Sequence, residues 1–364
     1  MHKKPLFLLI GTSLLVPVAA LLLAQDSRQK PQAQKTLDIY FLDTEGGQST
    51  LFASPSGESL LMDTGTKDGA GQQVDRIMAA IKEAGIQQLD YVIVSHYHGD
   101  HVGNAAELAN RLPIRHFFDH GPFTVELQPN RAAAFNSYLT VRERARATVP
   151  KPGDKIPVAG LDVEVVSSAG QLLTSPVAAA PGAGVPNPAC REASDKVQDP
   201  TPENYESVGI VVQYGRFRFL DLADLTWNQE EKLVCPNNLL GTFDVYHTTR
   251  HGTDWAGSPP LVHGARARVA VMNNGAKKGG TLDSWRIIHG TPGFEDLWQE
   301  HYSELVDKEH NPPENFLANL NETDHGYTLK MSVRSDGSFT MKNERNGFTK
   351  DYPAAKGAAL TSNR

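Results

Sequence analysis

The chain has 364 residues, of which 40% are hydrophobic and 21% are charged, a composition typical of one or two globular domains with a large core. Removal of Met1 to Ala24, which contain Lys3 and Lys4 and no acid, changes the formal net charge from −7 to −9 (33 basic minus 42 acidic residues). A chain this acidic is not expected to form a stable nucleic-acid complex or to bind an anionic membrane surface through its bulk charge.

The first 24 residues have the pattern of a secretory signal peptide: a basic start (MHKK), an apolar run to Ala24 and a polar stretch after it. We expect cleavage near Ala24, a linker over residues 25–36, and a periplasmic or secreted protein. The alternative is an uncleaved anchor, because Pro5 to Ala24 is nearly long enough to cross a hydrocarbon core of about 30 Å. Only in that case would the protein contact a membrane.

Strands and helices alternate over the next hundred residues. Alternating or continuous apolar runs predict strands at 37–43, on both sides of the Ser56-Gly57 turn, at 89–95 and at 114–121. Helical spacing predicts helices at 74–86, 103–112 and 130–147. This order favours helices packed against sheets.

The stretch from Ser168 to Pro202 is rich in Ala, Pro and Gly and predicts a long excursion, either a surface loop or a lid over the substrate. Regular patterns then resume. They predict strands at 207–215, 216–225, 243–249 and 267–274, a helix at 227–235, and a hairpin at 327–343. We expect one domain over residues 37–345 and a C-terminal tail over 346–364.

The chain has two cysteines, Cys190 in the excursion and Cys235 after the helix at 227–235. Because thiols of exported proteins tend to pair, we expect a disulfide between them that ties down the excursion. Two separate buried thiols are the alternative.

The strongest chemical signal is the sequence VIVSHYHGDHVGN, in which His96, His98, Asp100 and His101 directly follow an apolar strand. In a loop that leaves a strand, residues i and i+2 direct their imidazoles together, and the Asp-His pair one turn later can face a second ion. Imidazole nitrogen and carboxylate oxygen suit Zn²⁺, and Mn²⁺ or Fe²⁺ also fit by ligand type. We expect one or two ions here, against the alternative of a metal-free histidine cluster.

This motif resembles the first metal motif of the metallo-β-lactamase superfamily. The sequence FLDTEGGQSTLFASPSGESLLMDTG resembles, within that superfamily, the opening of the hydrolase domain of bacterial DNA-uptake competence proteins. The resemblance covers roughly residues 37–274 and implies an α/β fold, a four-layer αβ/βα sandwich with the metal loops at one edge between the sheets. It also places Asp63 where the family acid orders the metal loop without binding metal.

Two more ligands are implied by the resemblance. RFRFLDLADLTW is similar to the strand whose terminal acid bridges two metals, which points to Asp224; Asp221 is the alternative, but the family acid follows a small residue, as Asp224 follows Ala223. FDVYHTTRHGTDWAGSP is similar to the last metal motif and points to His251. His247, four residues earlier, is interpreted as a packing or supporting histidine.

The superfamily usually has another histidine between the first cluster and the bridging acid. This chain departs from that pattern, because no histidine occurs from Gly121 to Tyr246. In the competence-type group an Asn or Ser often lies in that neighbourhood, here Asn204 or Ser207. His120, at a strand end, is another candidate, either as a ligand or as a substrate contact.

Together these residues predict an exported metal-dependent hydrolase. A divalent ion lowers the pKa of bound water from about 15.7 towards 7 and polarises the attacked group, and Asp100 would orient that water or pass on its proton. The competence-type resemblance favours phosphodiesters, whose phosphates basic residues such as Arg142, Arg144, Arg146, Arg250, Lys277 or Lys278 could hold. The alternatives are a lactone or β-lactam hydrolase, which needs no basic groove, and a non-catalytic binding protein that retains the fold.

Overall fold

The structure is a computed structural model that describes residues 1–2, 36–122, 129–196, 202–321 and 326–355. Every element below belongs to one compact unit within residues 35–364. The expected signal peptide and nearly all of the expected linker lie outside the described residues. In the part that is described, no helix has the length and apolar character needed to span a membrane.

Most strands belong to two large sheets. The first has the order β20 (Thr349–Tyr352), β19 (Phe339–Asn343), β18 (Leu329–Val333), β1 (Leu37–Phe41), β2 (Thr50–Ala53), β3 (Ser59–Met62), β4 (Leu89–Val94), β5 (Ile114–Asp119) and β6 (Arg146–Thr148). The second has the order β17 (Leu317–Asn319), β16 (Asp296–His301), β15 (Val269–Met272), β14 (Val245–His247), β12 (Phe217–Asp221), β11 (Gly209–Tyr214), β8 (Asp162–Ser168) and β7 (Lys155–Ile156), with β9 (Gln171–Leu172) beside β8. A small third sheet pairs β10 (Val185–Pro186) with β13 (Asn237–Asn238).

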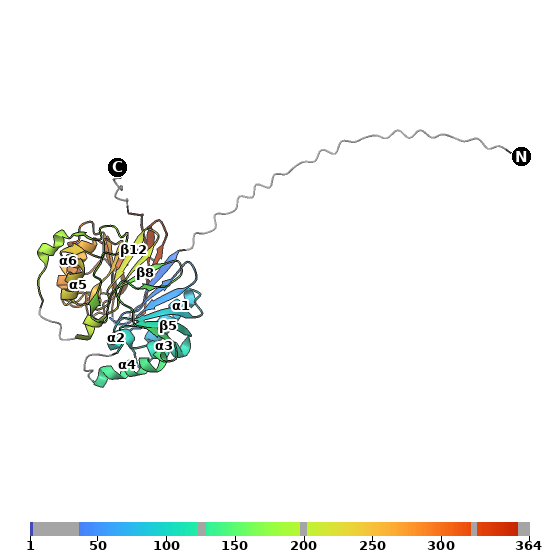
Figure 1. The fold of residues 1–364 in the computed structure, drawn as a ribbon, viewed down its shortest axis with the longest axis horizontal. Helices are drawn as coiled ribbons and strands as arrows, with labels where there is room; N and C mark the ends of the chain where they lie inside the picture. The colour runs from blue at the N-terminus through green and yellow to red at the C-terminus, as the bar shows by residue number, and fades with distance from the viewer. Residues whose placement is uncertain (3–35, 123–128, 197–201, 322–325, 356–364) are drawn as a thin grey trace. The chain divides into compact units, whose positions relative to one another are not determined.

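The two large sheets face each other across one apolar core. Phe219 of the second sheet contacts Phe41 and Phe52 of the first, with ring centroids 6.0 Å and 5.5 Å apart. The helices are α1 (Gln72–Glu83), α2 (Gly99–Val102), α3 (Ala105–Arg111), α4 (Pro129–Arg142), α5 (Trp227–Val234), α6 (Pro259–Ala265) and α7 (Leu282–His289). Two further cores form where α1, α3 and α4 cover the first sheet and where α5, α6 and α7 cover the second. Figure 1 shows α5 and α6 on one side of the strands and α1 on the other. The four-layer αβ/βα sandwich expected from the sequence is confirmed.

Parallel pairing gives the sandwich a single functional edge. Strands β3 to β6 pair in parallel, and so do β12, β14, β15, β16 and β17. The carboxyl ends of parallel strands meet at one edge of a sheet, where open α/β sheets place their ligands. The loops that follow β3, β4, β12, β14 and β15 carry nearly all the polar residues discussed below.

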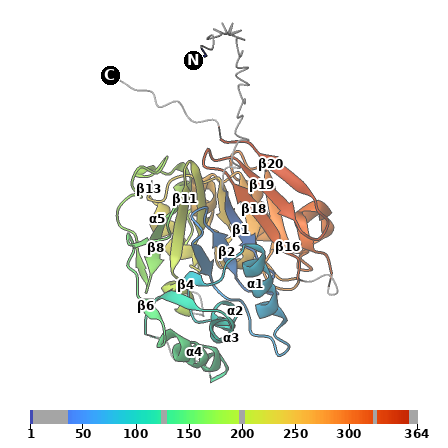
Figure 2. The ribbon, with the colours of Figure 1, turned by 90° about the vertical axis from the view of Figure 1, so that its right-hand side faces the viewer.

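Two differences from the predicted elements concern the positions where a helix and the domain end. The helix expected to run to Ala147 ends at Arg142, because Arg142 is bound by the buried Asp119 and the chain then adds β6 in parallel to β5. The expected tail after residue 345 contains β20, which pairs with β19 and places Tyr352 in the core. Figure 2 shows β18, β19 and β20 side by side next to β1.

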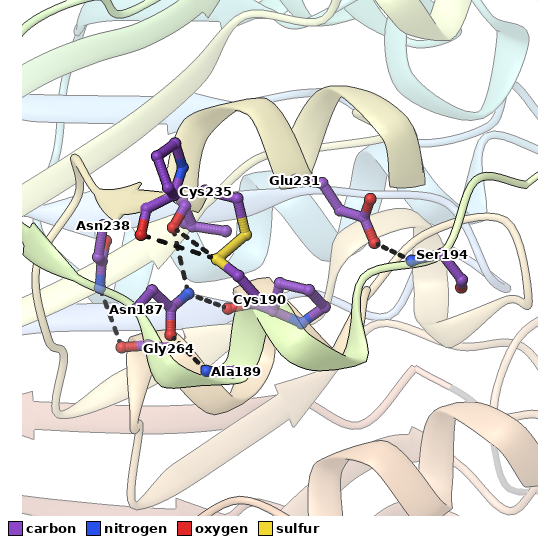
Figure 3. The surroundings of a disulfide bond; sticks show 11 residues. Asn187, Ala189, Cys190, Ser194, Glu231, Cys235, Asn238 and Gly264 are labelled. Atoms are coloured by element: carbon purple, nitrogen blue, oxygen red, sulfur yellow. Dashed lines mark hydrogen bonds between the residues drawn. A yellow bond between two sulfur atoms is a disulfide. The ribbon is translucent and has the colours of Figure 1, made fainter.

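The excursion is fixed to the outer layer formed by α5 and α6. Cys190 lies in the 3-10 helix η1 (Pro188–Glu192) and forms a disulfide with Cys235, which directly follows α5; the two Cα atoms are 5.8 Å apart. Asn187 lies next to the disulfide (Figure 3). Its amide donates to the carbonyl oxygens of Val234 and Pro260 at 3.2 Å and 2.9 Å. The expected disulfide is therefore present, and it ties the excursion to the second helical layer.

Replacement of both cysteines by serine should lower the free energy of unfolding by about 2–4 kcal/mol, because the bond closes a loop with a sequence separation of 45 residues. Urea unfolding of oxidised wild type, reduced wild type and the double variant measures this. Reduction should bring the wild type to the stability of the variant and leave the variant unchanged. Three equal free energies would contradict the prediction.

The start of α6 depends on a buried acid of α5. The Glu230 carboxylate has no exposed surface and accepts the backbone N–H groups of Gly257 and Ser258 at 2.9 Å and 2.8 Å. Burial raises the pKa of Glu230 to about 7, although these N–H groups favour the charged form. The acid therefore holds a proton in the folded state over a pH range in which the unfolded chain has released it.

The folded protein should consequently lose stability relative to a Glu230→Gln variant as the pH rises from about 4.5 to 7. The raised pKa does not lower the free energy of unfolding at a pH below the pKa that Glu230 has in the unfolded chain. The reduction is complete at a pH above the pKa of Glu230 in the folded protein, where it amounts to at most about 3 kcal/mol. Urea unfolding at several pH values tests this. The exposed Glu309→Gln variant is the control and should follow the wild type. A difference between Glu230→Gln and wild type that is constant with pH would exclude the effect.

Candidate metal centre

The loop after β4 is held by one buried carboxylate. Asp63, at the end of β3, is fully buried; its Oδ1 accepts the Ser95 N–H at 2.7 Å, and its Oδ2 accepts the Ser95 hydroxyl at 2.6 Å. The same Oδ2 lies 2.7 Å from Nδ1 of His101. Asp63 thus fixes the first and last parts of the sequence SHYHGDH, which is the role that the family resemblance implies for it.

Three histidines have one ring nitrogen engaged by a neighbour and the other directed towards Asp224. Nδ1 of His101 is bound to Asp63, Nδ1 of His96 lies 3.0 Å from the Ser95 hydroxyl, and Nδ1 of His251 lies 3.2 Å from the backbone oxygen of Asn273. A hydrogen bond at Nδ1 sets the tautomer and leaves the lone pair on Nε2, as in metal-binding histidines.

The predicted ligands of the two halves of the chain converge on Asp224. Its Oδ1 lies 3.2 Å from Nε2 of His101 and 3.4 Å from Nε2 of His251, and its Oδ2 lies 3.9 Å from Nε2 of His96. Nε2 of His96 is also 2.9 Å from Nδ1 of His98. Donor atoms of residues more than 150 positions apart in the sequence therefore surround one carboxylate.

The donor atoms form two overlapping groups that suit divalent ions. His96, His101 and Asp224 make one group, and Asp100, His101 and His251 make the other, with donor atoms of each group within 4.8 Å of one another. Nε2 of His101, Nε2 of His251 and Oδ1 of Asp224 are buried and meet no correctly oriented hydrogen-bond partner among the described residues. Buried atoms of this kind are costly unless another group binds them, and a metal ion would do so.

The electrostatics of the centre differ between its histidines. Burial opposes protonation of His101, but Asp224, Asp63 and Asp100 outweigh it and raise the pKa of this imidazole well above its ordinary value. Burial, and then the neighbouring His101 and His98, hold the pKa of His96 well below its ordinary value. Burial opposes ionisation of Asp224, but His101 and His251 outweigh it and hold the pKa of this acid well below its usual range. A neutral His96 beside an ionised Asp224 offers one nitrogen and one oxygen donor, the ligand types of zinc, manganese and iron sites.

Backbone conformations that most residues avoid occur at the centre. Asp63, Ala223, Arg250 and His251 have φ values of 61°, 50°, 50° and 59°, in the left-handed region. Such residues cost about 1–3 kcal/mol each, persist only where the surroundings enforce them, and gather at functional sites. Each lies just after a strand or next to a predicted ligand, so the sharp turns direct the donors towards the edge of the sandwich.

Two other candidates from the sequence have different roles. Asp221 binds Nδ1 of His247 at 2.8 Å and the amide of Gln48 at 3.2 Å. His247 packs between Phe41 and Phe219. Asp221 and His247 therefore belong to none of the groups of converging donor atoms, and they support the centre from within the core.

His120 lies in a separate hydrogen-bonded cluster. Its Nε2 is 2.8 Å from Oε1 of Glu203, which also accepts the Tyr97 N–H at 2.7 Å. Glu203 belongs to the 3-10 helix η2 (Pro202–Glu206), and the next residue, the buried Asn204, lines the cavity of the centre. Of the candidates for the missing histidine position, Asn204 is thus the one that reaches this cavity.

The centre opens into a cavity of about 350 Å³. It is lined by His98, Gly99, Asp100, Asn204, Asp224, Arg250, His251, Thr253, Trp255 and Lys278. Of the six basic residues named as phosphate contacts, Arg250 and Lys278 line the cavity, whereas Arg142 is bound to Asp119 and Lys277 lies 3.5 Å from Glu304. A larger cavity, of about 750 Å³, lies beside α7 and β16 and contains none of the predicted metal donors.

A third group of acids and histidine, Asp43, Glu45 and His301, was not predicted as a site. The guanidinium of Arg76 forms ion pairs with both acids of this group, because its Nη1 lies 3.0 Å from Asp43 and 3.1 Å from Glu45. Nε2 of His301 donates to Oδ1 of the same Asp43 at 2.7 Å. These contacts make the group an ion-pair cluster in its own right.

Sequence reasoning named Lys278 only as a possible phosphate contact and did not foresee that its ammonium contacts Asp100. It did not name Asn273, which orients His251. The available signal was their position. Both follow β15, a parallel strand of the second sheet, and so emerge at the edge where the predicted ligands lie. The Gly-rich sequence NNGAKKGGT after an apolar strand could have indicated a turn that closes on the site.

Comparison with known proteins agrees with this architecture. Residues 42–167 match the model of the metallo-beta-lactamase superfamily. No curated protein sequence matches the chain.

Solved structures with related folds are distant in sequence. The metallo-beta-lactamase fold protein YhfI of Bacillus subtilis is 13% identical (TM-score 0.45; 82% of this chain and 100% of that chain covered). The metallo hydrolase Igni18 of Ignicoccus hospitalis is 12% identical (TM-score 0.41; 82% and 100%). CmlA, a diiron beta-hydroxylase of Streptomyces venezuelae, is 10% identical (TM-score 0.39; 73% of this chain and 48% of that chain). With the matched family model and the two facing sheets, the chain has the fold of the metallo-beta-lactamase superfamily.

Proposed function

We propose that this protein is an exported metal-dependent hydrolase that acts on an anionic ester, with phosphodiesters as the favoured class. The observation that carries the proposal is the convergence of three buried atoms that have no correctly oriented hydrogen-bond partner among the described residues: Nε2 of His101 and Nε2 of His251 lie 3.2 Å and 3.4 Å from Oδ1 of Asp224. Chains with this fold are usually metal-dependent hydrolases.

His96, His98, Asp100, His101, Asp224 and His251 would hold one or two divalent ions, with Zn²⁺, Mn²⁺ and Fe²⁺ all fitting the donor set. A bound ion would lower the pKa of its water towards 7 and polarise the attacked group. Asp100 has a partly exposed carboxylate in the cavity wall, where it can accept a proton from the attacking water. Asp63 and the backbone of Asn273 keep the ligand histidines in the required tautomer.

The walls of the cavity support an anionic substrate. Lys278 and Arg250 supply two cationic side chains beside the donors, and the Asn204 amide supplies a neutral polar group. Trp255, 36% exposed, offers a flat apolar surface next to Arg250, whose guanidinium lies 5.8 Å from the ring centroid. A carbon-rich group on Trp255 with its phosphate near Lys278 fits this arrangement, and the sequence resemblance to the competence-type hydrolase domain favours the same class.

Export is supported by two independent features. Residues 1–24 have the basic, apolar and polar order of a signal peptide. The disulfide between Cys190 and Cys235 is typical of proteins that mature outside the reducing cytoplasm.

The hydrolase proposal predicts coupled loss of metal and activity. His98→Ala should reduce both metal affinity and turnover by more than about 100-fold, because even replacement of a residue behind the ligands typically costs 10–100-fold. Metal content is measured by mass spectrometry, and turnover with chromogenic phosphodiester, lactone and β-lactam substrates. His116→Ala is the matched control, since His116 is a buried histidine bound to Thr148, away from the cavity.

Turnover of the phosphodiester above that of the other two substrates supports the favoured class. Turnover of a lactone or β-lactam alone would instead identify the protein as a lactone or β-lactam hydrolase. A wild type that contains no metal and turns over none of the three substrates would support a non-catalytic binding protein. His120→Ala separates the two roles first considered for His120: lost metal would make it a ligand, whereas full metal content with reduced turnover would place it at the substrate.

Export predicts that protein recovered from the periplasm begins near Gln25 and contains no free thiol. Intact mass before and after alkylation measures both properties. A mature protein that still carries residues 1–24 would identify that segment as an anchor, and free thiols at Cys190 and Cys235 would argue against an oxidising compartment.

A further inference from the structure

Lys278 lies where a second metal ion would be expected. Its ammonium contacts Oδ2 of Asp100, and that same oxygen lies 3.4 Å from Nε2 of His251 and 3.7 Å from Nε2 of His101. Asp100, His101 and His251 are the donor group of the second position. The lysine therefore approaches the carboxylate oxygen through which Asp100 would coordinate an ion.

The surrounding backbone is built to hold Lys278 in this place. Its Nζ donates a second hydrogen bond, of 2.6 Å, to the backbone oxygen of Gly46. The turn that carries it is closed by the Gly275 N–H, which donates to the Lys278 oxygen at 2.8 Å, and by the Gly280 N–H, which donates to the His251 oxygen at 3.1 Å. A Cβ atom on Gly279 would lie 1.9 Å from that His251 oxygen, so the turn packs directly against the ligand residue.

Charge balance favours one ion together with this lysine. Three carboxylates contact the ligand histidines or the lysine: Asp63, Asp100 and Asp224. One divalent ion and one ammonium supply three positive charges and neutralise them, and Arg250 in the cavity wall adds one more that an anionic substrate would offset. Two divalent ions and the ammonium would supply five positive charges and leave an excess of two in a site whose histidines are fully buried, where uncompensated charge is costly.

We propose that the protein holds a single divalent ion, at His96, His101 and Asp224 with His98 beside them, and that the ammonium of Lys278 takes the place of the second ion beside Asp100. This inference rests on the proposed function, because it assumes that the centre binds metal. In it Asp100 pairs with Lys278 instead of a second ion, and its carboxylate keeps the role of proton acceptor in the proposed function. Lys278 is then a fixed cation that can contact an anionic substrate without a second metal.

The test is the number of ions that the full-length protein binds. Protein stripped with a chelator is equilibrated with Zn²⁺ or with Mn²⁺, freed of unbound ions and analysed by mass spectrometry. Wild type and Lys278→Arg should bind about one ion per chain, whereas Lys278→Met and Lys278→Gln should bind two, because loss of the ammonium frees Asp100 and its charge. Lys277→Met removes the neighbouring lysine, which faces Glu304 instead, and should still bind one.

A second readout is independent of both activity and total metal. Electron paramagnetic resonance of the Mn²⁺-loaded proteins should show an isolated ion in wild type and a spin-coupled pair in Lys278→Met. Two tightly bound ions in wild type, or one ion in both Lys278→Met and Lys278→Gln proteins that retain the circular dichroism of wild type, would overturn the inference and leave the hydrolase proposal intact. A wild type that binds no ion would overturn both.

Discussion

The buried carboxylate of Asp63 determines the geometry of the loop from which the centre is built. A charge with no exposed surface is tolerated only when its lone pairs are satisfied, and Asp63 achieves this with the backbone and hydroxyl of Ser95 and with the ring of His101. The same bonds select the tautomer that presents Nε2 of His101. The positions of both His96, which follows Ser95, and His101 therefore depend on one side chain that would not itself touch a metal.

A second connection joins the two sheets at this edge. Gln48 lies in the turn between β1 and β2 of the first sheet, and its backbone N–H donates to the Asp100 oxygen at 3.0 Å. Its side-chain amide bridges Asp221 and Asn273 of the second sheet, each at 3.2 Å. Since Asp221 binds His247 and Asn273 orients His251, a displacement of one sheet relative to the other would disturb ligands on both. The core aligns the sheets broadly, and Gln48 aligns the donors.

The sequence was informative where chemistry and local pattern coincide. The apolar strand before His96 and the spacing of His98, Asp100 and His101 predicted a metal loop, and the alternating strands predicted a sandwich of helices and sheets. Position after a strand could not decide between Asp221 and Asp224, because that choice depends on the left-handed conformation of Ala223, which turns one acid inward and the other towards the edge. The contact of Lys278 with Asp100 joins residues 178 positions apart and has no local signature.

The metal donors and the residues that line the rest of the cavity lie in different kinds of structure. The donors follow strands of two packed sheets, and residues in the left-handed region near them, at about 1–3 kcal/mol each, are stabilised by that packing. Asn204 and Trp255 instead lie in 3-10 or irregular segments that face the cavity. Loops of this kind tolerate substitution better than the strands that carry them. Changes in these loops would alter which substrate fits, while Asp63 and Gln48 would continue to hold the donors in the same arrangement.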